Sequence, residues 1–298
     1  GVFYCNTMFE GLKTMDVLVS DEKPKLLSDW KEKLENWKEK STATIDPNTL
    51  PKSEIKPVQS PTPKIIGEPI RLKLDQINMS EVWSMIDKKS LFKLSWGLRG
   101  KAGAESEEEH EQLLTEWKIR IIRDKLIEPE IVYGYFKCHN KDRKLLVENP
   151  AGDDIELEFP RSTKPDHLCL TDYFGENDIV AFQSVTVGNK VADIIEQWNK
   201  EDKYTDAYYL HGLAVEIAEA LAQWVNQRIN SELNLEKGGL RYSWGFPSCP
   251  DVAQHHLVWK LLKPEESGMT LTESGQIIPE QSTAAIVIHH PEAKYFVL

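Results

Sequence analysis

Apolar side chains recur at helical spacing in three stretches of the chain. Over residues 21–40, Leu and Trp return every three to four positions between Lys and Glu, which predicts an amphipathic helix that needs a partner surface. Ser106 and Glu109 form a capping-box pattern that opens a second helix ending near Leu126. The longest pattern covers residues 210–228. Each of these helices must bury its apolar face against another element.

Segments typical of strands lie between and after these helices. Residues 157–159, 179–187 and 284–288 are rich in Val, Ile, Phe and other apolar residues, which favours β-structure. Helices and strands follow one another in mixed order, and no βαβ unit repeats. The pattern therefore predicts the α+β class.

A proline-rich stretch divides the chain. Five prolines between residues 47 and 63 remove amide donors and favour extended conformations. We therefore expect residues 21–64 to be a helix followed by a linker, and residues 65–298 to be one domain. Residues 1–20 suggest a short strand and a helix that cannot bury their own apolar faces, so we expect them to be the end of another domain. Because no basic region follows Gly1, we expect a cut edge there rather than a signal peptide.

Charge and cysteine content exclude several classes of protein. The 298 residues include 36 Lys plus Arg and 48 Asp plus Glu, a formal net charge of −12. This excess of acid opposes long-range attraction to nucleic acid or to an anionic membrane. No stretch approaches the ~18 consecutive apolar residues of a membrane span. The four cysteines lie far apart without a C-x-x-C motif, which predicts a reduced, cytoplasmic protein.

Three short motifs have simple structural explanations. The glycines of residues 97–103 match neither the dinucleotide fingerprint nor the Walker pattern, so we interpret them as an ordinary loop. The pairs at residues 255–256 and 289–290 are adjacent histidines without further ligands at zinc spacing, so we predict no metal site. Residues 166–169 contain Asp, His and Cys, but no spacing ties them to a catalytic triad.

Residues 241–251, RYSWGFPSCPD, combine one Arg, three aromatic residues, one Gly and two Pro. This composition suits neither a helix nor a regular strand, and it predicts an ordered loop with an aromatic wall. Arg241 has the geometry to clamp a carboxylate in bidentate fashion. A rigid packing corner explains the same residue types, and on composition alone it is the slightly better explanation.

The same segment resembles the R-x-x-x-G-[YF]-P-[AS]-C-P-[DE] signature of a known family, the S-adenosylmethionine-binding activation domain of cobalamin-dependent methionine synthase. Four other segments resemble this family in the same order along the chain. They are residues 96–100 (WGLRG), 168–173 (LCLTDY), 210–213 (LHGL) with 218–220 (AEA), and 290–296 (HPEAKYF). Residues 2–4 and 9–12 are similar to the last strand and helix of the cobalamin-binding domain that precedes this module in the family.

The resemblance implies a single C-shaped α+β domain with a twisted antiparallel sheet and flanking helices. It implies a module that binds S-adenosylmethionine for the reductive methylation of cob(II)alamin. The implied cofactors are S-adenosylmethionine and cobalamin, the second held mainly by a neighbouring domain. The implied partners are the cobalamin-binding domain of the same enzyme and a flavodoxin-type reductase. No catalytic side chain and no protein metal ligand is implied, because positioning is the main contribution of the protein.

The resemblance also assigns ligand contacts. Arg241 is expected to hold the methionyl carboxylate, and Asp87 and Glu219 are expected to face the cationic groups. The remaining expected contacts are Ser243, Gly245, Phe246, Tyr295 and Phe296. Without the resemblance, Asp87 would be a helix-end residue and Glu219 part of a solvated helix face. Trp244 stands where the family is expected to have a small residue or Pro, and Phe246 stands where Tyr is commoner, which leaves the adenine contacts open.

Two other functions fit parts of the sequence. One is an acidic module that docks proteins and binds no small ligand. The other is a stand-alone methyltransferase, against which the missing G-x-G-x-G loop argues. The D-x-H-x-x-G pattern that ligates cobalamin is also missing, so we expect that this chain alone does not make methionine.

Overall fold

The computed structural model describes residues 14–41, 50–98 and 104–298, in two compact units, residues 1–50 and 51–298. In the first unit, helix α2 spans Lys23–Ser41, which confirms the helix predicted over residues 21–40. The strand predicted near the N-terminus, and most of the short helix after it, lie outside the described residues. No helix in the described part of the chain is long and apolar enough to cross a membrane.

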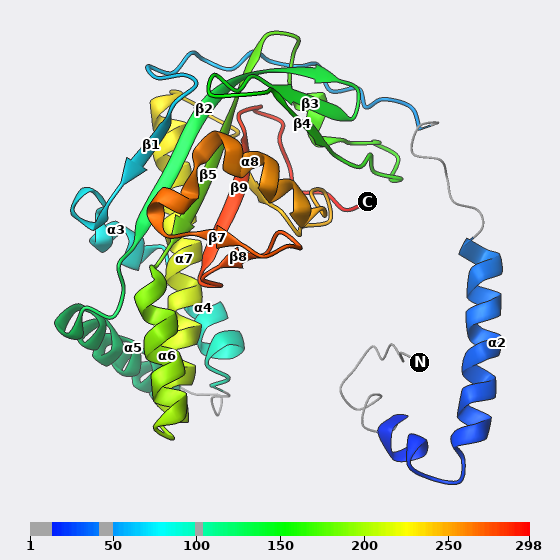
Figure 1. Cartoon of the computed structure of the whole chain (residues 1–298), viewed down its shortest axis with the longest axis vertical. Coiled ribbons are helices and arrows are strands. Elements are labelled where there is room, and N and C mark those ends of the chain that lie inside the picture. The colour runs from blue at the N-terminus through cyan, green and yellow to red at the C-terminus, as the bar shows by residue number, and fades with distance from the viewer. Residues whose placement is uncertain (1–13, 42–49, 99–103) are drawn as a thin grey trace. The chain divides into compact units, whose positions relative to one another are not determined.

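The second unit is built on one antiparallel sheet (Figure 1). Its strands follow the order β4-β3-β2-β5-β9-β6, and β1 also pairs with β2. The strands are β1 Pro69–Leu72, β2 Glu130–Lys141, β3 Lys144–Val147, β4 Ile155–Glu158, β5 Asp178–Thr186, β6 Leu240–Ser243 and β9 Ser282–Ile288. A separate hairpin consists of β7 Thr270–Leu271 and β8 Ile277–Ile278. Strand β6 therefore forms one edge of the main sheet.

Helices flank this sheet. They are α3 Met79–Ser84, α4 Lys88–Ser90, α5 Ala104–Asp124, α6 Asn189–Lys200, α7 Tyr204–Glu232 and α8 His255–Leu262. Shorter turns of helix are Leu74–Gln76, Leu91–Ser95 (a π-helix), Leu170–Tyr173, Val252–Gln254 and Pro264–Ser267. The positions of α5 and α7 confirm the two helices predicted from apolar spacing in this unit. Helix α5 begins at Ala104, so the expectation that Ser106 opens it is wrong.

Both faces of the sheet are buried, with α7 and α8 on opposite faces (Figure 1). Side chains alternate along β2 because successive residues of a strand point to opposite faces. Tyr133 and Tyr135 belong to the core that contains α7, whereas Val132 and Phe136 belong to the core that contains α8. The predicted α+β fold, a twisted antiparallel sheet with flanking helices, is confirmed.

The second half of the proline-rich stretch packs along the sheet domain. The Ser60 backbone N–H donates to Asp178 Oδ1 at 2.8 Å. The Nε2 atoms of His289 and His290 lie 2.6 and 3.0 Å from the backbone carbonyl oxygens of residues 58 and 56. These contacts satisfy backbone polar groups of an extended segment that is not paired as a strand in the sheet. The compact unit consequently begins at Pro51, before the boundary expected at residue 65.

Candidate functional site

A cavity of about 370 Å³ brings together Asp87, Glu219 and Arg241, three of the ligand contacts expected from the sequence. They come from the start of α4, the middle of α7 and the edge strand β6, which are far apart along the chain. The rest of the lining is Met85, Ser90, Glu216, Ala220 and Gln223. We call this the acidic cavity.

Arg241 is held at the sheet edge with its guanidinium toward α7. In β6 it pairs with Val287 of β9. Its Nη2 donates to Glu219 Oε2 at 2.6 Å, whereas the contact of its Nη1 among the described residues is a long one, 3.4 Å to Ser243 Oγ. The Arg241 side chain is 14% exposed and that of Glu219 is 48% exposed. Arg241 is thus oriented by Glu219 and keeps donor capacity for a carboxylate.

Asp87 is the N-cap of α4. Its Oδ1 accepts hydrogen bonds from the backbone N–H groups of Lys89 and Ser90 at 3.0 and 3.1 Å. The hydrogen bond from Ser90 is the main reason that the pKa of Asp87 lies below its usual value. Among the described residues no ion pair neutralises this carboxylate, so Asp87 offers a negative charge to the cavity.

Glu216 is a cavity residue that our sequence analysis missed. Gly212, one turn earlier on α7, lets the π-helix Leu91–Ser95 come close to the helix. A Cβ atom at Gly212 would lie 3.0 Å from the Ser95 carbonyl oxygen and 3.0 Å from Trp96 Cδ1. This close approach places Ser95 Oγ 2.9 Å from Glu216 Oε1, to which it donates. The signal in the sequence is spacing, because residues three apart on a helix share a face and Glu216 precedes Glu219 by three.

Burial is the main cause that raises the pKa of Glu216 above its usual value. The negative charges of Asp87 and Glu219 raise it further, and the hydrogen bond from Ser95 lowers it. A carboxylate that is kept partly desolvated beside two others is costly for the fold. Such groups concentrate at functional sites, where a ligand offsets the cost.

The expected closing aromatics lie together in a second cavity of about 460 Å³, which we call the aromatic cavity. Phe246, Tyr295 and Phe296 line it, with Pro247, Ser248 and Val297. The Tyr295 hydroxyl donates to the Arg241 backbone oxygen at 3.2 Å, and its ring centroid lies 5.1 Å from that of Tyr242. Tyr295 therefore connects the aromatic cavity to the strand that carries Arg241.

Ser243 and Gly245 line neither cavity. Ser243 is the last residue of β6, and Gly245 has φ +100°, a conformation that favours glycine, while its N–H donates to the Cys249 oxygen at 2.8 Å. The expectation that residues 241–251 contain no regular strand is wrong for residues 241–243. Pairing with β9 supplies a ladder partner that composition does not reveal.

Trp244 lines neither cavity. Its side chain is 7% exposed, and its ring centroid lies 6.2 Å from that of Phe182 and 5.2 Å from that of His255. The bulk of this residue, which departs from the family signature, therefore fills the core on the α8 side. It does not narrow the acidic cavity.

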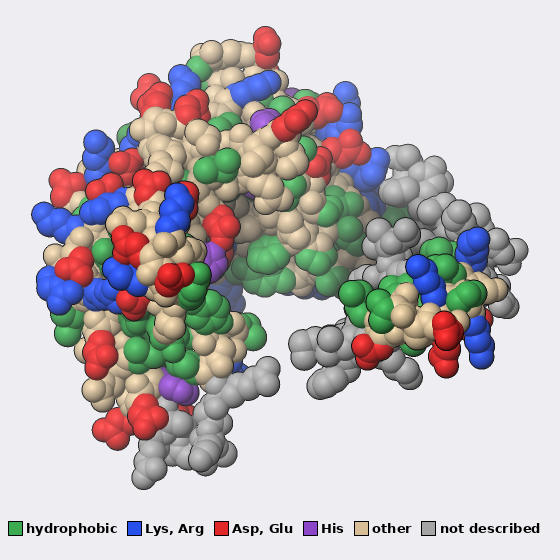
Figure 2. Space-filling model, turned by 60° about the horizontal axis from the view of Figure 1, so that its bottom comes forward, with side chains coloured by type: hydrophobic (Ala, Val, Ile, Leu, Met, Phe, Trp, Pro, Cys, Tyr) green, Lys and Arg blue, Asp and Glu red, His purple; other side chains and the backbone are tan. Residues whose placement is uncertain are grey.

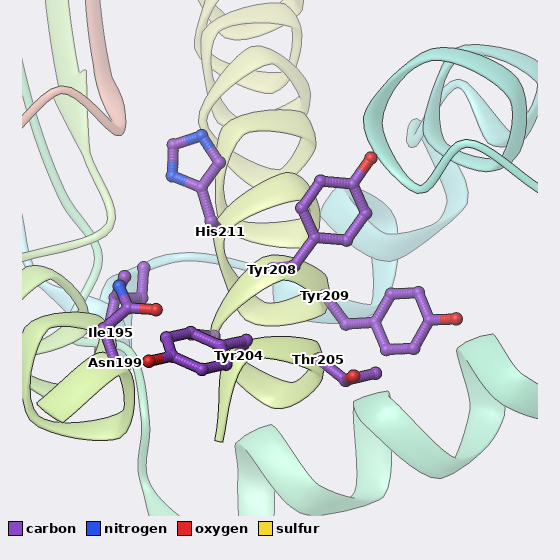
Figure 3. Close-up of a pocket in the computed structure, with 8 residues that line it drawn as sticks. Ile195, Asn199, Tyr204, Thr205, Tyr208, Tyr209 and His211 are labelled. Carbon is purple, nitrogen blue, oxygen red and sulfur yellow. The ribbon is translucent and has the colours of Figure 1, made fainter. Parts of the chain in front are cut away.

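A third cavity, of about 600 Å³, lies between α6 and α7 (Figure 3). Figure 3 shows Tyr204, Tyr208 and His211 on α7, at its border. The imidazole of His211 is already partnered, since its Nδ1 lies 3.0 Å from Gln281 Nε2 and its Nε2 lies 3.3 Å from Glu280 Oε1. None of the residues expected to bind ligand lines this cavity.

Other reactive side chains are used structurally. Burial raises the pKa of the Cys138, Cys169 and Cys249 thiols, which disfavours thiolate chemistry. Arg161 donates to both carboxylate oxygens of Asp172 at 2.7 and 2.9 Å in a buried pair. Within residues 14–41, 50–98 and 104–298 no cluster of three His, Cys, Asp or Glu side chains is placed to hold a metal ion.

The surface charges are mixed. Figure 2 shows acidic and basic side chains interspersed over the face in view. Several basic side chains are paired with acids, as in the contacts of Lys88 with Glu111 at 2.7 Å and of Arg143 with Glu158 at 3.1 Å. The acidic cavity is different, because it holds three carboxylates and one guanidinium.

The fold and the cavity define an antiparallel α+β domain with charged side chains gathered in one candidate ligand site. Residues 78–298 match the family model described as vitamin B12 dependent methionine synthase, activation domain, and the chain belongs to this family. The resemblance found in the sequence is thereby confirmed.

Similar proteins agree with this assignment. Methionine synthase of Mycobacterium tuberculosis (strain ATCC 25618 / H37Rv) is 29% identical over 99% of this chain, and that of Mycobacterium leprae (strain TN) is 28% identical over 99%. The chain spans 30% and 29% of these two relatives. A crystal structure described as the MetH reactivation domain bound to AdoHcy superposes with a TM-score of 0.68 at 20% identity. It covers 80% of this chain and 83% of that one, and it supports the fold.

Proposed function

We propose that this chain binds S-adenosylmethionine and serves as the reactivation module of a cobalamin-dependent methionine synthase. One observation carries the proposal: Asp87, Glu219 and Arg241 meet in a single cavity of a chain that belongs to the activation-domain family. The acidic interaction module without a ligand does not explain why a largely buried guanidinium and the half-buried carboxylate of Glu216 line the same cavity.

The charges of the cavity suit this ligand. S-adenosylmethionine carries a carboxylate, an ammonium and a sulfonium. Arg241 would bind the carboxylate through its free donors, and the cavity carboxylates would favour the two cations. The faces of Phe246 and Tyr295 would add cation–π attraction of roughly 0.5 to 2 kcal/mol and cover the adenosyl part. Ser243 and Gly245 would contribute by shaping the strand end and the loop.

Cobalamin, held by a neighbouring domain, would supply the centre that accepts the methyl group. The residues of this chain would bind S-adenosylmethionine, fix its orientation and exclude water from its charged end. Orientation of this kind accounts for much of the barrier lowering in group transfer. We infer a flavodoxin-type reductase and the cobalamin-binding domain as partners, and the cytoplasm as the compartment.

Calorimetric titration with S-adenosylmethionine tests the proposal. We expect saturable binding with one ligand per chain, competition by S-adenosylhomocysteine, and loss of binding when Asp87 and Arg241 are both replaced. The matched control is Arg143→Ala, which breaks the ion pair with Glu158 of β4, at the other end of the strand order from β6. This variant should bind S-adenosylmethionine like the wild type. If the folded wild-type chain shows no saturable heat of binding, the proposal is wrong and the acidic interaction module becomes the better explanation.

A further inference from the structure

We propose that Glu216, and not Glu219, recognises the sulfonium charge, so that the acidic cavity selects S-adenosylmethionine over S-adenosylhomocysteine. This inference rests on the proposed function. It assigns the two acidic residues of α7 different tasks, with Glu219 positioning Arg241 and Glu216 meeting the cation. The sequence comparison with the family suggested only Glu219 for this face.

Glu219 is already neutralised. Its Oε2 lies 2.6 Å from Arg241 Nη2, and about half of its side chain is open to water. A paired and hydrated carboxylate presents little net charge to a neighbouring ligand. Its effect on binding is therefore exerted through the orientation of the guanidinium.

Glu216 keeps its charge uncompensated. The Ser95 hydroxyl is its hydrogen-bond partner, and the salt bridges found among the described residues do not include it. The charged groups that face it are Asp87 from the start of α4, Glu219 from its own helix, and Arg241 from β6 through its pair with Glu219. A ligand cation placed here would relieve the repulsion between Glu216 and the neighbouring carboxylates.

The chemistry of the sulfonium explains why Glu216 suits it better than Asp87 does. A sulfonium has no N–H to donate, so it is recognised by charge rather than by a directed hydrogen bond. Charge acts more strongly where water is partly excluded, and Glu216 is half-buried whereas Asp87 is exposed. The ammonium does donate hydrogen bonds, and the open carboxylate of Asp87 suits it.

Glu216→Gln is the main variant, because glutamine keeps the size and can still accept the hydrogen bond from Ser95. Binding of S-adenosylmethionine and of S-adenosylhomocysteine, which lacks the sulfonium charge, is measured by calorimetry. We expect the affinity for the charged ligand to fall about tenfold or more and that for the neutral ligand to change less than about threefold. Glu219→Gln, one turn away, is the matched control and should weaken both ligands by similar factors.

The pH dependence supplies a readout that a structural role would not move. In the wild type, the preference for the charged ligand should be present above the pKa of Glu216 and decline as pH falls through it. In Glu216→Gln the preference should be low and nearly independent of pH in that window. Thermal unfolding without ligand verifies that both variants are folded.

Equal weakening of both ligands by Glu216→Gln would overturn the inference, as would a loss of preference in Glu219→Gln alone. Either result leaves the proposed function intact, because the wild type still binds S-adenosylmethionine. A wild-type chain that binds neither ligand would overturn the proposed function itself. The two failures are therefore distinguishable in one set of titrations.

Discussion

Replacing Arg241 with alanine removes the guanidinium that lines the acidic cavity. In the structure this group is largely buried and is oriented by a 2.6 Å contact with Glu219, and within the described part of the chain its Nη1 makes one long contact. If it holds the methionyl carboxylate, the ligand loses a charge-assisted contact in a partly desolvated site. We therefore expect Arg241→Ala to weaken S-adenosylmethionine binding with little effect on the fold.

The size of the effect follows from the geometry. Hydrogen bonds to charged groups contribute about 1.5–3 kcal/mol, which corresponds to roughly 10- to 150-fold in affinity. The result should lie toward the upper end, because the unpaired Glu219 would then repel the ligand carboxylate. The free energy of unfolding should fall by less than about 1 kcal/mol, since half-exposed Glu219 regains water when its partner is lost.

Calorimetry with matched variants measures this change. Arg143→Ala is the control, because Arg143 and Glu158 lie 3.1 Å apart with exposures of 19% and 50%, close to those of the Arg241 pair. It should bind S-adenosylmethionine like the wild type. Arg241→Lys should be intermediate, because lysine keeps the charge and loses the planar fork. A folded Arg241→Ala chain with an unchanged dissociation constant would remove Arg241 from the site.

Three further predictions concern stability. Burial raises the pKa of Glu216 above its ordinary value of 4.5, so its contribution to stability is present below about pH 4.5 and is lost as pH rises through the folded pKa. At about pH 7 the charged side chain destabilises the fold, and Glu216→Gln should therefore unfold at a higher urea concentration than the wild type. Burial lowers the pKa of His255 below 6.5, so stability should fall as pH drops from 6.5 toward the folded pKa, and His255→Gln should flatten this slope in urea titrations. Trp244→Phe should lower the free energy of unfolding by roughly 1–3 kcal/mol and leave S-adenosylmethionine affinity unchanged, whereas a weakened affinity would mean that Trp244 reaches the site.

Parts of the fold were predictable from hydrophobic spacing, and parts were not. Helix α7 shows a long helical period because one face packs on the sheet, and β5 and β9 are apolar enough to be recognised. Strand β2, which pairs with three others, was not predicted. Its residues are buried on both faces of a covered sheet, so the alternation of polar and apolar residues that marks a half-buried strand is missing.

The site shows a similar limit. The resemblance pointed to Asp87, Glu219 and Arg241, and the structure brings these three together. The resemblance does not point to Glu216, and its spacing of three residues from Glu219 shows a shared helix face but not a half-buried position. Its surroundings depend on the close approach of Ser95 to α7. That approach is a tertiary contact, which helical periodicity does not encode.

Composition left two explanations open for the segment from Arg241 to Trp244, a ligand loop and a packing corner, and its residues fit both. Strand β6 pairs with β9 at the edge of the sheet, and as in any strand its side chains alternate between the two faces. Arg241 lines the acidic cavity on the α7 side, whereas Tyr242 and Trp244 are buried in the core that contains α8. Tyr242 and Trp244 thus pack in the core, and this packing fixes the position of the strand that carries Arg241. Replacement of Arg241 should consequently affect binding, whereas replacement of Tyr242 or Trp244 should affect the stability of the fold.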